Sequence, residues 1–477
     1  MIKNHTFFKA IQKATLTVLV FMVLVQCSEE ELLPVMSESN NITPHAIESN
    51  KSEPLTDTCV ECAYIVPAGK KVIDGKELGL KPGSIIGLNA AIQYGTLEFH
   101  NLIGTKEAPI IVRNFGGQVR IVADDKWHAI KTEKSKYFRI TGGTVYGEYG
   151  ILVEGGEMGL KLDGLSTNFE VDHVEVAKSG FAGIMAKTDP SCDDATIRGN
   201  FTMYDVSLHD NFIHDTGGEG FYVGNSFWDG MDRSCGKRLP HEIKGLKIYN
   251  NIVKNTGWEA IQVGCAIEGS EIYNNAIENY GTVNKEHQNN GIQIGTGTGG
   301  LVYNNLIKKG TGNGMIVLGT GDNIIYNNII VDAGSNGVFC DERYTPGEGF
   351  KFVNNTIVNP AKDGIRLYAE KVPMNTIINN IIANPGAYGS YRYSRTNDDA
   401  FVYLSSKKIR IKKSNNLFAK SVDEIKFVDP DNDNYRLRPN SPAVNYGKDI
   451  SRFDIPRDFY KAIRQKGFAV DIGASEY

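Results

Sequence analysis

Several features are scarce in this 477-residue sequence, and each scarcity excludes a class of protein. The chain has 7 Cys, and the CxxC formed by Cys59 and Cys62 has no second pair with which to build a zinc site. The net charge is −5, and about −8 once Lys3, Lys9 and Lys13 of the leader are removed, which argues against a nucleic-acid binder that relies on a global basic field. The apolar run LTVLVFMVLVQ (16–26) is too short for a comfortable membrane span. Signatures of helix-turn-helix and leucine-rich repeats are also missing.

One short phrase, in contrast, returns from His209 to Asn416. It is an apolar alternation that ends in Asn-Asn, or once Asp-Asn, at 209–211, 249–251, 273–275, 303–305, 326–328, 353–355, 378–380 and 414–416. The shortest spacings between the first Asn of successive pairs are 24 (250 to 274), 23 (304 to 327) and 25 (354 to 379) residues. A period in the low twenties with period-2 alternation predicts one coil of a β-solenoid per repeat. We therefore expect an all-β fold, a single-stranded parallel β-helix whose coils share one apolar core.

A second phrase lies between the Asn pairs, a Gly or Ala followed by alternating apolar residues, as in GFYVG (220–224) and GMIVLG (314–319). We expect one set of residues to point into the core: Phe221 and Val223, Ile261 and Val263, Ile292 and Ile294, Ile316 and Leu318, Val338 and Cys340, Ile365 and Leu367. The residues between them should face outward in one column: Met185, Tyr222, Gln262, Gln293, Val317, Phe339 and Arg366. The Asn pairs are expected at a tight bend, where Asn tolerates a left-handed conformation and bonds backbone amides of the next coil.

The N-terminus has the features of a targeting segment. Residues 1–26 combine a basic start with the apolar run, and the ending LVQC resembles a bacterial lipoprotein box, which implies a lipidated Cys27. An ordinary signal peptide followed by a coincidental Cys is the alternative. The acidic SEEE that follows resembles the signal by which some Gram-negative bacteria place lipoproteins on the outer face of the outer membrane. The expected location is therefore the cell surface, with residues 27–62 as a flexible tether and membrane contact only through the lipid.

Six Cys remain after Cys27 in an exported, disulfide-permissive context. Cys59 and Cys62 are close enough to pair locally. Cys192 and Cys235 both fall in irregular segments that flank neighbouring coils, and we predict a disulfide between them. Cys265 and Cys340 are expected to be packing residues.

Specific phrases of the chain resemble a known family. FAGIMAKTDP (181–190), NFTMYDVSLHDNFIHDTGGEGFYVGNS (200–226) and NTGWEAIQVG (255–264) are similar to those of pectate-lyase-like right-handed parallel β-helix lipoproteins from bacterial glycan-utilisation systems. The resemblance covers most of 63–477 and implies a right-handed helix, which spacing alone does not show. We assign 63–425 to the β-helix and 426–477 to a C-terminal cap that covers the open edge of the last coil.

Function is expected in the residues that a coil does not need. The surplus NSFWDGMDRSCGKRLPHEI (225–243) follows the strand of Tyr222, and TVNKEHQ (282–288) precedes the strand of Gln293; a third surplus is SYRYSRTNDDA (390–400). The first two insertions are predicted to wall a cleft over the outward column. Its cationic and amide groups, on a chain that is acidic overall, suit an anionic carbohydrate.

The chemistry that fits best is β-elimination on a uronic acid, which requires neutralising the carboxylate, removing the adjacent proton and protonating the leaving oxygen. The predicted catalytic residues are Lys187, Tyr222, His241 and His287, and the predicted substrate-binding residues are Trp228, Arg233, Arg238, Gln262, Gln293, Arg343 and Arg366. Bound Ca²⁺ is a candidate cofactor, because a calcium ion can neutralise the uronate carboxylate. The partner would be an anionic polysaccharide or oligosaccharide, with marine sulfated polymers such as ulvan implied by family context only, and the protein is expected to be a monomer.

Alternatives remain open at this stage. A lyase would expel the next sugar, whereas a dehydratase would expel water from a terminal uronic acid. Glycoside hydrolysis needs two carboxylic acids, and Glu219 with Glu259 or Asp341 with Glu342 are candidates. The GDD and NTD phrases of polygalacturonases are absent, and so are the phrases typical of alginate lyases, chondroitinase B and pectate lyases. Each candidate also has a structural interpretation: hydrogen bonding for His241, stacking for Tyr222, a surface ladder for Gln262 and Gln293, turn bonding for Glu219 and Glu259, and bend packing for His209 and His214. A non-catalytic surface glycan binder is the third possibility.

Overall fold

The computed structural model describes residues 58–143, 149–343, 347–389 and 397–477. Cys27, the predicted signal peptide, most of the tether and residues 390–396 of the third insertion lie outside this part, and the predictions for them stay predictions. The described residues form strands and short 3₁₀ turns and contain no α-helix. In the same residues, no helix is long and apolar enough to cross a membrane.

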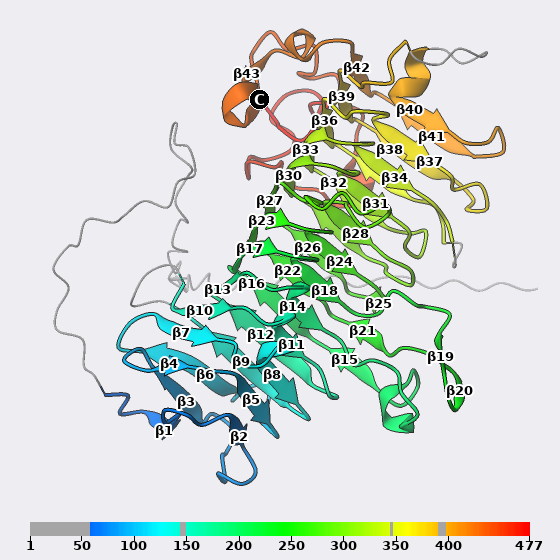
Figure 1. Cartoon of the computed structure of the whole chain (residues 1–477). Helices are drawn as coiled ribbons and strands as arrows, with labels where there is room; N and C mark the ends of the chain where they lie inside the picture. Colours follow the sequence, from blue (N-terminus) through cyan, green and yellow to red (C-terminus); the bar gives the residue numbers. More distant parts are fainter. Residues whose placement is uncertain (1–57, 144–148, 344–346, 390–396) are drawn as a thin grey trace, which may run out of the picture. The chain divides into compact units, whose positions relative to one another are not determined.

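Three long parallel sheets make up the fold, and each coil contributes one short strand to each sheet (Figure 1). Sheet A contains β1 (Cys62–Ile65), β3 (Ile85–Asn89), β6 (Ile110–Phe115), β9 (Lys136–Thr141), β12 (Thr167–Asp172), β16 (Val206–His209), β22 (Lys247–Tyr249), β26 (Glu271–Tyr273), β29 (Leu301–Tyr303), β32 (Ile324–Tyr326), β35 (Lys351–Val353), β38 (Asn375–Ile378) and β41 (Ile411–Ser414).

Sheet C contains β4 (Gln93–Tyr94), β7 (Val119–Val122), β10 (Ile151–Glu154), β13 (Val174–Ala177), β17 (Phe212–Thr216), β23 (Ile252–Thr256), β27 (Ala276–Glu278), β30 (Leu306–Gly310), β33 (Ile329–Ala333), β36 (Thr356–Val358), β39 (Ile381–Ala383) and β42 (Leu417–Ala419). Sheet B contains β2 (Val72–Asp74), β5 (Leu97–His100), β8 (His128–Glu133), β11 (Met158–Leu162), β14 (Ala182–Ala186), β18 (Phe221–Val223), β24 (Ile261–Val263), β28 (Ile292–Ile294), β31 (Met315–Val317), β34 (Val338–Cys340), β37 (Ile365–Leu367) and β40 (Val402–Leu404). The chain thus passes from sheet A to C to B in each coil. This arrangement is a parallel β-helix, which confirms the predicted fold class.

The Asn pairs occupy the bend between sheets A and C. The first residue of each pair has a left-handed backbone, with φ of 55° at Asn250, 54° at Asn304 and 53° at Asn327. The second residue is buried in every pair except the last, at Asn416, and forms a ladder: Oδ1 of Asn305 accepts hydrogen bonds from the backbone N and Nδ2 of Asn275 at 3.1 and 2.9 Å. Both the left-handed backbone and the side-chain bond to a backbone amide are present, divided between the two residues, but the amide belongs to the preceding coil and not, as predicted, to the next.

The interior is a continuous column of Ile, Val, Leu and Phe side chains drawn from all three sheets. Period-2 alternation explains this, because residues on either side of an outward residue turn to the same face of a strand. Phe221, Ile261 and Ile292 pack above one another in register and are fully buried. Each coil shares its buried surface with the next, so the stack rather than the single coil is the stable unit.

Additional structure lies at the turn from sheet B to sheet A. A small parallel sheet there contains β15 (Thr202–Tyr204), β21 (Glu242–Lys244) and β25 (Ala266–Glu268), and beside it the hairpin of β19 (Met231–Arg233) and β20 (Gly236–Arg238) extends outward (Figure 1). The 3₁₀ turns are η1 (Asp194–Thr196), η2 (Asn397–Ala400), η3 (Val422–Glu424), η4 (Pro430–Asn432) and η5 (Ser451–Phe453). Past β42, the hairpin of β43 (Phe427–Asp429) and β44 (Asn434–Leu437) leads to a segment that packs against sheets A and C.

Candidate active site

The outer face of sheet B has the predicted column, with one correction. In the register of the sheet, Tyr222 pairs with Gln262, Gln262 with Gln293, and Phe339 with Arg366. The residue paired with Gln293 is Ile316, and Val317 is fully buried in the core. The prediction that Val317 faces outward was wrong by one residue. Met315 takes the inward position that follows the Gly, and Leu318 begins the next turn instead of ending the strand.

Lys187 and Tyr222 meet at one end of this column. Lys187 follows β14, and its Nζ lies 4.3 Å from the centroid of the Tyr222 ring and donates to Oδ1 of Asp189 at 2.9 Å. Both side chains are buried, with 8% and 7% of their surface exposed. Burial lowers the pKa of Lys187, but Tyr222 and Asp189 outweigh it and raise the pKa above its usual value. The ammonium is therefore a fixed positive charge against an aromatic face.

A chain of hydrogen bonds continues from Tyr222 along the column. Its phenolic oxygen lies 3.2 Å from Oγ of Ser226, which also accepts a hydrogen bond from Nε2 of Gln262 at 2.9 Å. Nε2 of Gln293 in turn donates to Oε1 of Gln262 at 3.0 Å. The structure therefore brings four predicted residues together: Lys187, Tyr222, Gln262 and Gln293. Ser226, which bonds Tyr222, was not among the predicted residues. It lies in an insertion, where the period-2 pattern does not show which way a side chain points.

Two buried carboxyl groups lie three residues before members of this column, in the turns that lead into strands of sheet B. Glu219 precedes β18 and Glu259 precedes β24, and they are 1% and 0% exposed. Burial raises the pKa of Glu219 to about 7 and that of Glu259 to about 8. Nδ2 of Asn290 donates to Oε1 of Glu259 at 3.1 Å, which is the turn bonding considered for this position.

His241 does not face the column. It is fully buried, Nε2 accepts a hydrogen bond from the backbone N of Thr188 at 3.0 Å, and Nδ1 lies 3.0 Å from the carbonyl oxygen of Glu242. Burial lowers its pKa to about 4. The prediction of a catalytic His241 in the cleft is contradicted, because both ring nitrogens are bonded to backbone groups and none of the side chain reaches solvent.

The insertion 282–288 folds back over the preceding turn. The backbone N of Thr282 bonds the carbonyl of Thr256 at 3.0 Å, and Nζ of Lys285 lies 3.3 Å from the centroid of the Trp258 ring. His287 projects from this insertion with 88% of its side chain exposed, and its Nε2 lies 3.6 Å from Oε1 of Glu286. The structure does not bring His287 to Tyr222 or Gln293.

The first insertion is held together by its own arginines. Nε of Arg233 donates to the carbonyl of Pro190 at 2.8 Å, and Nε of Arg238 donates to that of Ser191 at 2.8 Å. The predicted disulfide between Cys192 and Cys235 is present and joins the same two segments. Cys59 and Cys62 are also bonded to each other. These contacts give Arg233 and Arg238 a structural role that the prediction of substrate binding did not include.

Trp228 lies beside the site, but its ring is engaged by the protein. The guanidinium carbon of Arg198 is 3.7 Å from the ring centroid, and a Cβ at Gly297 would lie 2.0 Å from Cε3 of Trp228. Both contacts occupy ring surface that a stacked sugar would need. Only glycine fits at position 297 against the Trp228 ring. That glycine is the one feature of the sequence that could have indicated this contact.

The two remaining predicted residues lie farther along. Arg366 belongs to the column, three coils beyond Gln293, where its Nη1 donates to Oδ2 of Asp363 at 2.6 Å and its guanidinium stacks on Tyr403 at 3.9 Å. Arg343 is exposed and its Nε donates to Oδ2 of Asp341 at 3.0 Å. Hollows of about 780 Å³ and 310 Å³ lie elsewhere, against the C-terminal segment and beside sheet A, and neither includes the residues around Tyr222.

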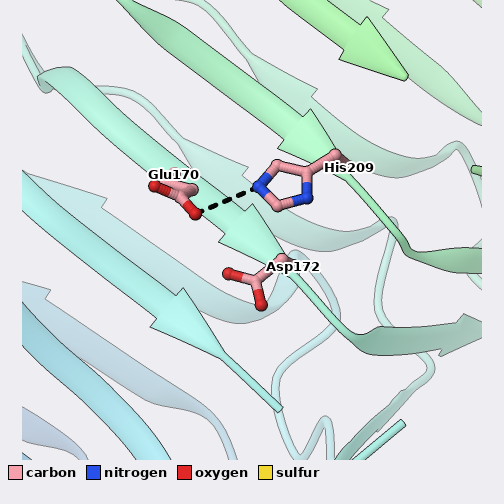
Figure 2. Close-up of side chains that lie close together, drawn as sticks. All are labelled: Glu170, Asp172 and His209. Atoms are coloured by element: carbon pink, nitrogen blue, oxygen red, sulfur yellow. Dashed lines mark hydrogen bonds and ion pairs between the residues drawn. The ribbon is translucent and has the colours of Figure 1, made fainter. Parts of the chain in front are cut away.

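Among the residues that the structure describes, one group of side chains has ligand atoms close enough to hold a metal ion: Glu170 and Asp172 of β12 and His209 of β16 (Figure 2). Nε2 of His209 lies 3.0 Å from Oε1 of Glu170, and Nε of Arg139 lies 2.7 Å from Oδ2 of Asp172 and 3.2 Å from Glu170. Two cationic side chains already balance these carboxylates, which favours a charge network over a metal site. The group also lies on sheet A, whereas Ca²⁺ was predicted for the outward column of sheet B.

The fold and this site define a parallel β-helix protein with a polar, partly buried cluster on the outer face of one sheet. Among protein families, the one described as right handed beta helix region matches residues 240–418, which agrees with the hand implied by the resemblance. A comparison with curated protein sequences finds no match.

Several solved structures are similar to this chain at low sequence identity. The pectate lyase Pel9A is 14% identical with a TM-score of 0.48, over 83% of this chain and 88% of that one. An alginate lyase from Paenibacillus sp. str. FPU-7 is 16% identical with a TM-score of 0.36, over 73% and 98%. A GH136 lacto-N-biosidase from Eubacterium ramulus is 12% identical with a TM-score of 0.39, over 71% and 62%. At these identities none of the three assigns an activity to this chain.

Proposed function

We propose that this protein is a carbohydrate-active enzyme that performs β-elimination on uronic-acid-containing polysaccharides or oligosaccharides. The observation that carries the proposal is the contact set formed by Lys187, Tyr222, Ser226, Gln262 and Gln293 on the outer face of sheet B. It combines a buried cation, a phenol and a line of amide groups on a face along which an extended polymer can lie.

Each group has a task in the reaction. The ammonium of Lys187 and the amides of Gln262 and Gln293 neutralise the uronate carboxylate and the charge that develops beside it. The phenol of Tyr222 gives its proton to the leaving oxygen and takes the proton from the carbon beside the carboxylate, while the bond to the leaving oxygen breaks and a carbon–carbon double bond forms. Ser226 holds the phenolic oxygen in place. Low exposure strengthens these interactions, because the site excludes the water that would otherwise screen them. Expulsion of a sugar would make the protein a lyase, and expulsion of water a dehydratase.

Glycoside hydrolysis is less well supported by the geometry. The carboxyl pair proposed for it, Glu219 and Glu259, lies on adjacent coils at equivalent positions, and both side chains are sealed from solvent. A hydrolase requires its two acids on opposite sides of the scissile bond, with room for a sugar between them. The pair therefore does not flank a substrate.

The test is the ultraviolet absorbance of an unsaturated uronate, followed while purified protein is incubated with uronate polymers and their oligosaccharides, with and without Ca²⁺ or a chelator. We expect absorbance to rise, with Tyr222→Phe losing about 10²-fold or more in kcat/KM and Lys187→Met a similar amount. Lys247→Met serves as the matched control, because it removes an exposed lysine from sheet A.

Each outcome of this assay has a distinct meaning. A product from polymers indicates a lyase, and a product only from oligosaccharides indicates a dehydratase. New reducing ends without absorbance would replace elimination by hydrolysis. Retained binding without any product would leave a glycan-binding protein.

A further inference from the structure

A second column of side chains runs beside the outward column of sheet B. Its members each lie three residues before an outward residue: Glu219, Glu259, Asn290, Asn313, Asn336 and Asp363. They occupy equivalent places, since the carbonyl oxygens of Glu259, Asn290 and Asn313 each accept a hydrogen bond from the preceding coil. Arg366 bonds Asp363, which places this column on the same outer side as the outward column.

The amides of this column form a ladder with one direction. Nδ2 of Asn336 donates to Oδ1 of Asn313 at 2.8 Å, and Nδ2 of Asn313 donates to Oδ1 of Asn290 at 2.8 Å. Nδ2 of Asn290 then donates to Oε1 of Glu259 at 3.1 Å. At every step the residue of the later coil donates to the residue of the earlier coil.

The ladder changes chemistry at its last step. Glu259 and Glu219 are neighbours in register, on parallel strands that lie about 4.8 Å apart. One oxygen of each carboxyl group, Oε2, is buried without a hydrogen-bond partner. Two ionised carboxylates in adjacent buried positions repel each other, and burial disfavours both charges. A proton on one of them would remove the repulsion and supply the missing donor.

We infer that Glu259 is a neutral carboxylic acid at neutral pH, which takes the place of an asparagine in the ladder by accepting from Asn290 and donating its proton to Glu219. Glu219 then bears the single negative charge of the pair. This continues the direction of the ladder, because Glu259 belongs to the later coil. It also gives both unpartnered oxygens a bond.

The charges around the pair agree with this order. For Glu219, burial raises the pKa, while its own backbone N–H and the ammonium groups of Lys187 and Lys285 lower it, to a net value of about 7. For Glu259, burial and the charge of Glu219 raise the pKa to about 8, against smaller lowering by its backbone N–H, Asn290 and Lys285. Burial is the largest influence on both pKa values, and the charge of Glu219 raises that of Glu259 further.

The test of the shared proton is thermal stability against pH. Glu259→Gln has an amide that can donate to Glu219 and a carbonyl that can accept from Asn290, so it mimics the protonated acid without titrating. A carboxyl group with a raised pKa in the folded state stabilises below its unfolded pKa of about 4.5, and this contribution is lost as pH rises towards about 8. We expect the Tm of the variant minus that of the wild type to increase by about 2 °C or more as the pH rises from 5 to 9.

Glu286→Gln is the matched control, because it removes a carboxylate that is 89% exposed and should parallel the wild type. A constant difference in Tm between Glu259→Gln and the wild type across this pH range would overturn the shared proton. A wild type without product would overturn the proposed function while leaving the Tm result intact.

Discussion

Histidine side chains occupy two opposite environments in this protein. His241 is surrounded by backbone groups and apolar atoms, including the ring of Phe201 at 5.0 Å, and its pKa falls to about 4. His209 is also largely buried, but its two ring nitrogens lie 2.6 Å from Asp210 and 3.0 Å from Glu170. Burial lowers its pKa, and these carboxylates more than reverse the effect, to about 9. The same residue type is thus neutral in one place and cationic in the other.

This contrast leads to a prediction for His209→Gln. A histidine with a raised folded pKa stabilises below its unfolded pKa of about 6.5, and the contribution is lost as pH rises through about 9. The wild type should therefore lose about 2 kcal/mol of unfolding free energy more than the variant between pH 6 and 9. Chemical denaturation at the two pH values measures this, with the exposed His287→Gln as control. Equal losses in wild type and His209→Gln would mean that His209 is not charged in the folded protein.

Within a coil, the two asparagines of a pair do different work. Asn304 supplies the left-handed backbone, and its side-chain oxygen, Oδ1, has no hydrogen-bond partner. Asn305 accepts two hydrogen bonds from Asn275 and donates to the carbonyl of Ile272 at 2.9 Å. Removing the second side chain would therefore leave buried donors and acceptors unpaired in two coils.

The expected result is a large difference between neighbouring substitutions. Asn305→Ala should lower the unfolding free energy by about 2–4 kcal/mol, because each unsatisfied buried group costs about 1–3 kcal/mol. Asn304→Gly should change it by less than about 1 kcal/mol, since glycine adopts the left-handed region without strain. Equilibrium denaturation of both variants measures the difference. Similar losses in the two would show that the ladder contributes little beyond the backbone conformation.

At the scale of the whole β-helix, the C-terminal segment packs along the side of the coils, against sheets A and C. Nδ2 of Asn327, Asn354 and Asn379 donates to carbonyl oxygens of Arg457, Asp471 and Lys448 at 2.8, 2.9 and 2.8 Å. Apolar residues of the same segment, Ile450, Ile455 and Val470, cover Val353 and Ile378 of sheet A. The first asparagines of these later pairs therefore have a second use as attachment points.

Deleting residues 447–477 should destabilise the protein strongly. The segment buries Ile450, Ile455, Val470 and Ile472, and each buried aliphatic side chain is worth about 1.5–3 kcal/mol. We expect a loss of at least about 5 kcal/mol together with aggregation through the uncovered faces, measured by thermal denaturation and light scattering. Phe468→Ser, at a side chain that is 90% exposed, is the control and should behave like the wild type. An unchanged Tm in the deletion would show that the coils are stable without this cover.

The repeating part of the fold could be predicted from the sequence, because each coil contacts chiefly its neighbours and the same local pattern recurs in all of them. The strand alternation, the Asn bend and the members of most of the outward column follow from that pattern, and the disulfide from two irregular segments on neighbouring coils. The exception, Ile316 in place of Val317, arose where GMIVLG has one residue more than GIQIG and periodicity could not say where the extra residue goes.

Only the tertiary structure decided which polar residues meet. Ser226 and Lys187 lie outside the repeating strands, and their contacts with Tyr222 depend on how the segments after β14 and β18 leave the sheet. His241 and His287 were both predicted as catalytic residues, yet one is fully buried and the other 88% exposed. Burial and charge at such positions are set by side chains from several coils at once. That is why the sequence by itself determined the β-helix, and packing between coils decided the site.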